Sequence, residues 1–119
     1  MSAKTTQGAI AAHFRDRAPN VAATYAALLN AARALGPMTE EPKKTSIHLV
    51  RTSAFAGVAT REAALVLTLK SATDLASARI RKRERASAHR WHLEVRLAEP
   101  AEVDSELRRW LAAAYALAG

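Results

Sequence analysis

The stretch Arg90-Trp91-His92-Leu93-Glu94-Val95-Arg96-Leu97 decides the fold class, because its side chains alternate between apolar and polar. A period of two is typical of a strand with one face on a core and one face in solvent. The basic segment 79–86 precedes it and is compatible with a helix on propensity grounds. We favour instead the preceding strand of a hairpin, with a tight turn at 87–89, and its register stays open.

Three earlier segments also have strand character. Residues 45–50 are rich in β-branched side chains, and residues 53–60 contain Phe55, Gly57 and Val58 in a short strand pattern. Residues 65–69 place three leucines on one face. Together with the hairpin, these segments predict an antiparallel sheet of about five strands.

Helical periodicity flanks this run of strands. A short helix is predicted over residues 6–15, a stronger one from Pro19 to the stop at Gly36-Pro37, and a last one from Pro100 onward. Asp104 and Glu106 in its first turns suit capping and the helix dipole. The order predicts an α+β two-layer sandwich, with two to three helices on one face of the sheet.

Length and composition limit the class of protein. A chain of 119 residues with 50% apolar residues predicts one folded domain over residues 1–119, with residues 1–5 loose. The absence of cysteine excludes disulfides, thiol catalysis and cysteine-based zinc or iron–sulfur sites. No apolar run is long enough for a transmembrane helix, and no signal peptide is visible, so we expect a cytoplasmic protein with no membrane partner.

The net charge of +7 is the unusual quantity. Thirteen of the eighteen basic residues are arginine, which a GC-rich genome favours through its codons. A basic surface also attracts anionic partners. Net charge alone does not separate these two explanations.

Several short sequence segments occur together in a characteristic order. They are His13-Phe14, Tyr25 to Leu35-Gly36-Pro37, Pro42-Lys43-Lys44-Thr45-Ser46-Ile47-His48, Phe55-Ala56-Gly57-Val58, Arg79-Ile80-Arg81-Lys82, the segment 90–97, and Val103-Asp104-Ser105-Glu106-Leu107 leading to Trp110-Leu111 and Ala114-Tyr115. In this order the chain resembles a bacterial domain of unknown function, family 5655, from about residue 10 onward. The resemblance implies no activity.

The chain is also distantly similar to YdhG-like domains. This similarity implies a frataxin-like sandwich but no role as an iron chaperone, since the iron-binding surfaces of frataxins are acidic. Arg83 stands where the family often has an apolar residue.

Two groups of basic residues are candidates for anion binding. Lys43-Lys44-Thr45-Ser46 offers ammonium and hydroxyl groups at a strand start but lacks the glycines of a P-loop, and the alternative is a solvated loop. Residues 79–96 contain seven basic and two acidic side chains. In a hairpin, such a segment would follow a nucleic-acid backbone, clamp a smaller anion, or simply protect an edge strand from aggregation.

Histidines and carboxylates offer weaker sites. His48, His89 and His92 would form a metal site if their strands converged, but no carboxylate is suitably spaced with them. Glu84 and Glu94 resemble ion-pair partners more than a catalytic pair. No catalytic set, metal or cofactor is predicted.

These observations favour a small binding module that recognises an anionic ligand through a basic face of the sheet. The predicted ligand-binding residues are Lys44, Thr45, His48, Arg51, Arg79, Arg81, Arg90 and His92. The alternatives are a nucleic-acid-binding accessory domain, an enzyme on a phosphorylated or carboxylated metabolite with His48 or His92 as base, and a structural protein–protein module. Alanine-rich helix faces would also permit a homodimer.

Overall fold

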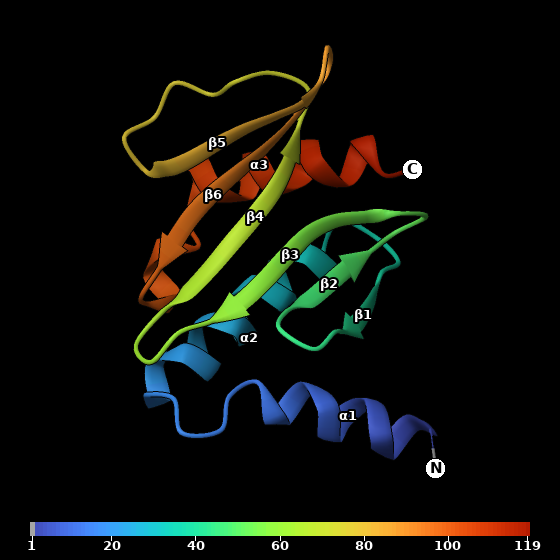
Figure 1. Ribbon diagram of the computed structural model, residues 1–119, viewed down its shortest axis with the longest axis vertical. Helices are drawn as coiled ribbons and strands as arrows, with labels where there is room; N and C mark the ends of the chain where they lie inside the picture. Colours follow the sequence, from blue (N-terminus) through green and yellow to red (C-terminus); the bar gives the residue numbers. More distant parts are fainter. Residues whose placement is uncertain (1) are drawn as a thin grey trace.

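The computed structural model describes residues 2–119, with side chains from residue 6 onward. In chain order the elements are α1 (Ser2–Ala12), α2 (Pro19–Arg33), β1 (Thr39–Pro42), β2 (Ile47–Val50), β3 (Ala54–Thr60), β4 (Leu65–Ser71), β5 (Ile80–Ser87), β6 (Arg90–Leu97), a short 3-10 turn η1 (Pro100–Glu102) and α3 (Ser105–Leu117). The fold is α+β, as the sequence predicts (Figure 1). None of the described helices is long and apolar enough to cross a membrane.

The six strands form one antiparallel sheet in the order β1-β2-β3-β4-β6-β5. Residues 72–79 carry the chain from β4 to the outer edge, where β5 begins, and β6 then returns between β4 and β5. In Figure 1, α2 and α3 lie behind the sheet. We call the side they cover the inner face and the opposite side the open face. No helix among residues 2–119 covers the open face in this view.

The core lies between the inner face and the two helices. Alternate strand residues supply its sheet half, namely Leu65, Leu67 and Leu69 from β4 and Leu93, Val95 and Leu97 from β6. From the helices come Val21 and Leu28 of α2 and Leu107 and Leu111 of α3, all fully buried. Each buried leucine contributes roughly 1.5–3 kcal/mol relative to an exposed one. The predicted periodicities of two and of 3.6 therefore identify the core correctly.

The β5–β6 hairpin is confirmed, and its register is now defined. Lys82 and Glu84 pair with Glu94 and His92, whereas Arg83 pairs with Leu93 and Arg85 with Trp91. Opposite residues of an antiparallel pair share a face. Arg83 and Arg85 therefore point to the inner face, and the bulge between Ile80 and Lys82 makes this possible without moving Ile80 out of the core.

Three details differ from the predictions. The sheet has a sixth strand, β1, whose sequence Thr-Glu-Glu-Pro has low strand propensity and is tolerated because β1 is an edge strand. The last α-helix begins at Ser105 rather than Pro100, because Asp104 caps it and Pro100–Glu102 forms a separate turn. The first helix spans Ser2–Ala12 rather than residues 6–15.

The predicted loose stretch at residues 1–5 stays a prediction, since Met1 and the side chains of residues 2–5 lie outside the described part. The second helix ends shortly before its predicted stop at Gly36-Pro37, and Ala34 rather than Gly36 is its C-cap. α2 ends at Arg33, and Gly36 follows with a φ of 147°, a conformation that side chains disfavour. A methyl group on Gly36 would lie 2.5 Å from Tyr115 Oη, so this glycine also permits close packing on α3.

Candidate functional site

The open face of the sheet is hollowed into a trough of about 440 Å³ over β2, β3, β4 and β6. The strand register explains its position. Glu41, His48, Gly57, Thr68, Glu94 and Lys82 form one row of neighbours across all six strands. The trough therefore lies at the centre of the sheet, where the row contains a glycine.

Small residues form the floor of the trough. The β3 residues that line it include Ala54, Ala56, Gly57 and Ala59, which have a methyl group or no side chain, and Phe55, whose side chain is buried. A central strand with such small side chains leaves its backbone accessible from the open face. Val66 of β4 adds an apolar surface beside Ala59, its partner in the register.

Polar side chains form the walls. His48 stands on β2, Thr68 and Lys70 on β4, and His92 and Glu94 on β6. Arg61 lines the opposite end of the trough from Lys70, next to the β3–β4 turn. His48 and the Thr68 hydroxyl form no hydrogen bond with any described residue, so both are available to a ligand.

The polar side chains of the walls have few partners of their own. Lys70 Nζ lies 3.5 Å from Ser53 Oγ, a long hydrogen bond, and forms no ion pair with a described carboxylate. His92 Nδ1 lies 3.7 Å from the exposed carboxylate of Glu84. Glu94 is neutralised by Arg81, whose Nε lies 3.6 Å from it. The trough thus keeps positive charge at Lys70 and at Arg61.

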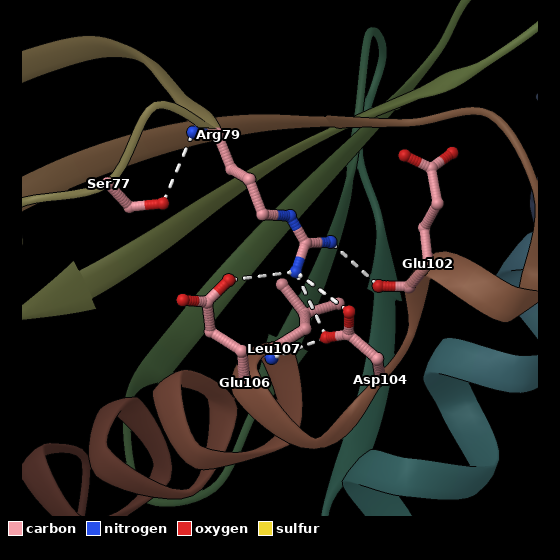
Figure 2. Close-up of polar contacts among 6 residues, drawn as sticks. All are labelled: Ser77, Arg79, Glu102, Asp104, Glu106 and Leu107. Atoms are coloured by element: carbon pink, nitrogen blue, oxygen red, sulfur yellow. Dashed lines mark hydrogen bonds and ion pairs between the residues drawn. The ribbon is translucent and has the colours of Figure 1, made fainter.

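Arg79 lies beside the start of α3, on the side of the sheet that the helices cover, and both of its terminal nitrogens donate hydrogen bonds (Figure 2). Its Nη1 donates to Asp104 at 3.0 Å and to Glu106 at 3.2 Å, and its Nη2 donates to the Glu102 carbonyl at 2.8 Å. Figure 2 shows the guanidinium between these groups at the start of α3. Burial acts to lower the pKa of Arg79, but the two carboxylates outweigh it and raise that pKa above its ordinary value. Its predicted place on the basic sheet face is wrong.

Two arginines of β5 also contact other groups of the chain. Arg83 Nε donates to Asp74 at 2.8 Å, and its Nη2 donates to the carbonyls of Leu75 and Ser77. It therefore holds the 72–79 connection against the sheet edge. Arg85 lies 5.9 Å from the Trp91 ring, in a cation–π contact on the inner face. The arginines of β5 are therefore divided between the two faces of the sheet, with Arg83 and Arg85 on the inner face and Arg81 on the open face.

The remaining predicted residues are dispersed. Arg51 donates to the Tyr115 carbonyl at 3.1 Å and stacks 4.3 Å above the Tyr115 ring, near the end of α3. Lys44 and Thr45 are exposed in the β1–β2 loop, and Arg90 donates to the carbonyl of His89 at the hairpin tip. Of the eight predicted residues, the structure brings His48, His92 and, through Glu94, Arg81 to the trough.

The three histidines considered as a metal site do not all come together. His48 and His92 line the trough, whereas His89 lies in the turn between β5 and β6. Among residues 2–119, no group of three His, Asp or Glu side chains is arranged to hold a metal ion. Glu94 forms an ion pair with Arg81, and the Glu84 carboxylate lies 3.7 Å from His92 Nδ1.

Sequence reasoning missed Lys70, Thr68 and Arg61. The signal for the first two was present, since Thr68 and Lys70 alternate with the leucines of 65–69 and must share the polar face with His92 and Glu94. No sequence pattern placed Arg61 on this face, because a turn residue does not follow the alternation of a strand. The position of Gly57 in the floor of the trough could not be predicted either, because it depends on which strands lie beside β3.

A family model described as "Domain of unknown function (DUF5655)" matches residues 10–118. No curated protein and no solved structure matches the chain. The similarity to YdhG-like domains stays a prediction.

Proposed function

We propose a function for this chain, which belongs to the family described as a domain of unknown function (DUF5655), from the geometry of its open sheet face. The protein is a small binding module that holds an anionic ligand in the trough. Lys70 supplies the charge, and His48, Thr68 and His92 supply hydrogen bonds. The observation that supports this most is a cavity of about 440 Å³ with an accessible lysine, in the size range of small-molecule sites.

The distribution of satisfied and unsatisfied cations supports the same proposal. Arg79 and Arg83 are occupied by carboxylates and carbonyls of the chain itself. A guanidinium that already donates to internal acceptors has little left to offer a ligand. Lys70, by contrast, has one long contact to a hydroxyl, and forming an ion pair with a ligand would replace nothing of comparable strength.

The same distribution disfavours a nucleic-acid backbone as the ligand. Such a partner needs a row of free cations along one surface. Three of the arginines in residues 79–90 are occupied on the inner face, and Glu84 and Glu94 interrupt the open face of β5 and β6. Small anions are therefore the ligand class that we test first.

The test is an NMR titration of uniformly labelled protein with inorganic phosphate and with acetate. We expect saturable shifts of the amides of Thr68, Lys70 and His92, with millimolar dissociation constants that rise with chloride concentration. Lys70→Met should weaken phosphate binding at least fivefold. Its matched control is Lys44→Met in the exposed β1–β2 loop, which should leave the affinity unchanged.

Two results would overturn the proposal. One is an absence of saturable shifts at the trough in low-salt buffer. The other is binding of a labelled duplex DNA or single-stranded RNA, followed by fluorescence polarisation, in which losses are spread over Arg81, Lys82, Arg90 and Arg96 rather than concentrated at Lys70.

A further inference from the structure

We infer that the ligand of the trough is an organic acid with a flat apolar body, which lies over Gly57 while its acidic group meets Lys70. This inference rests on the proposed function and names its ligand class. It follows from the contrast between the floor of the trough, which is small and apolar, and its ends, which are cationic.

The small residues of the floor favour a ligand with a flat group. On the open face, Ala54, Gly57 and Ala59 of β3 present no side chain larger than a methyl group, because Phe55 and Val58 are buried on the inner face. Inorganic phosphate would leave this apolar surface in water, whereas an aromatic ring would cover it. Apolar area removed from water contributes roughly 25 cal/mol per Å², so a ligand that covers the floor gains affinity over a bare anion.

His48 closes one side of this floor. A methyl group placed on Gly57 would lie 3.8 Å from His48 Cδ2, which is ordinary van der Waals contact. A ring lying on Gly57 would therefore touch the imidazole. Across the floor, Thr68 of β4 is the register partner of Gly57, so His48 and Thr68 flank the glycine on its two sides. Such a slot suits a planar group better than a bulky one.

The positions of Lys70 and Arg61 determine how the acid would be oriented in the trough. Val66, Thr68 and Lys70 follow one another on the open face of β4, so Lys70 lies about 13 Å along the strand from Val66, at roughly 3.3 Å per residue. Lys70 stands at one end of the trough and Arg61 toward the other, with the small residues between them. An acid whose carboxylate reaches Lys70 therefore places its ring over Gly57.

The experiment compares four probes by calorimetry and NMR: 2-naphthoate, its neutral analogue 2-naphthylmethanol, acetate and inorganic phosphate. We expect 2-naphthoate to bind at least tenfold more tightly than acetate and than the alcohol. Amide shifts should include Gly57 for the naphthyl probe, whereas acetate and phosphate should shift Lys70 and not Gly57.

The variant Gly57→Leu fills the floor without altering any charge. Gly57 has no positive φ, and its Cβ would meet only an ordinary contact, so the backbone accepts a side chain. We expect Gly57→Leu to lose at least tenfold in naphthoate affinity and to keep phosphate affinity within twofold. Gly57→Ala, which adds only a methyl group, should lose less, and Thr39→Leu on the exposed edge strand β1 is the control.

The outcomes separate the two proposals. If phosphate shifts Lys70 but naphthoate binds no more tightly than acetate, or if Gly57→Leu keeps full naphthoate affinity, the flat-acid inference is wrong and the anion-binding module stands. If the alcohol binds as well as the acid, or if no probe binds, the anion-binding function itself is wrong and the inference fails with it.

Discussion

The inner-face site around Arg79 and the open-face trough each contain a basic side chain, but the two cations differ in what they contact. Arg79 donates to two carboxylates and one carbonyl and has a side chain that is 25% exposed. Lys70 in the trough has one long contact to a hydroxyl. The difference teaches that positive charge in this chain has two uses. On the inner face it stabilises the fold, and on the open face it remains available.

The largest effect that would test this comparison is loss of stability on removing Arg79. Arg79→Met leaves Asp104, Glu106 and the Glu102 carbonyl without their shared donor. We expect the free energy of unfolding to fall by about 1–2 kcal/mol in urea denaturation. The matched control is Arg81→Met, whose single ion pair to Glu94 is more exposed and should contribute less than about 0.5 kcal/mol. Equal losses in the two variants would contradict the comparison.

A smaller effect is expected on the titration of Asp104. The backbone N–H of Leu107 and then the Arg79 guanidinium hold the pKa of this carboxyl below its ordinary value. A carboxyl whose folded-state pKa is depressed stabilises the fold above its unfolded pKa, and the gain is lost as the pH falls through the folded pKa. In Arg79→Met, the pKa of Asp104 should rise but stay below its ordinary value, because the Leu107 contact remains. NMR titration of the carboxyl carbon measures this, and an unchanged pKa would show that Arg79 does not act on it.

The smallest effect on stability is expected in the trough. Lys70→Met removes an ammonium whose contact to Ser53 is at the limit of a hydrogen bond. Its free energy of unfolding should therefore change by less than about 0.5 kcal/mol, even though phosphate affinity falls. Thermal and urea unfolding of the variant check this. A loss as large as that of Arg79→Met would place Lys70 among the structural cations.

The inner side of the fold could be predicted from the sequence because it depends on local patterns. The alternation of residues 90–97 identified a half-buried strand, and helical periodicity identified α2, whose buried residues include Val21, Tyr25 and Leu28. Asp104 was recognised as a cap because capping acts within one helical turn. β1 was missed, since an edge strand of Thr-Glu-Glu-Pro is held by its pairing with β2 and not by its own propensity.

The sequence by itself determined the class of fold, the order of its elements, the core and an excess of positive charge. Only the tertiary structure decided which cations are available to a ligand. Arg79 meets Asp104 across 25 residues, and Arg83 turns to the inner face because a bulge shifts the register of β5. Neither contact follows from the local pattern, because the partners of a long, flexible cationic side chain are set by which segments the fold brings beside it.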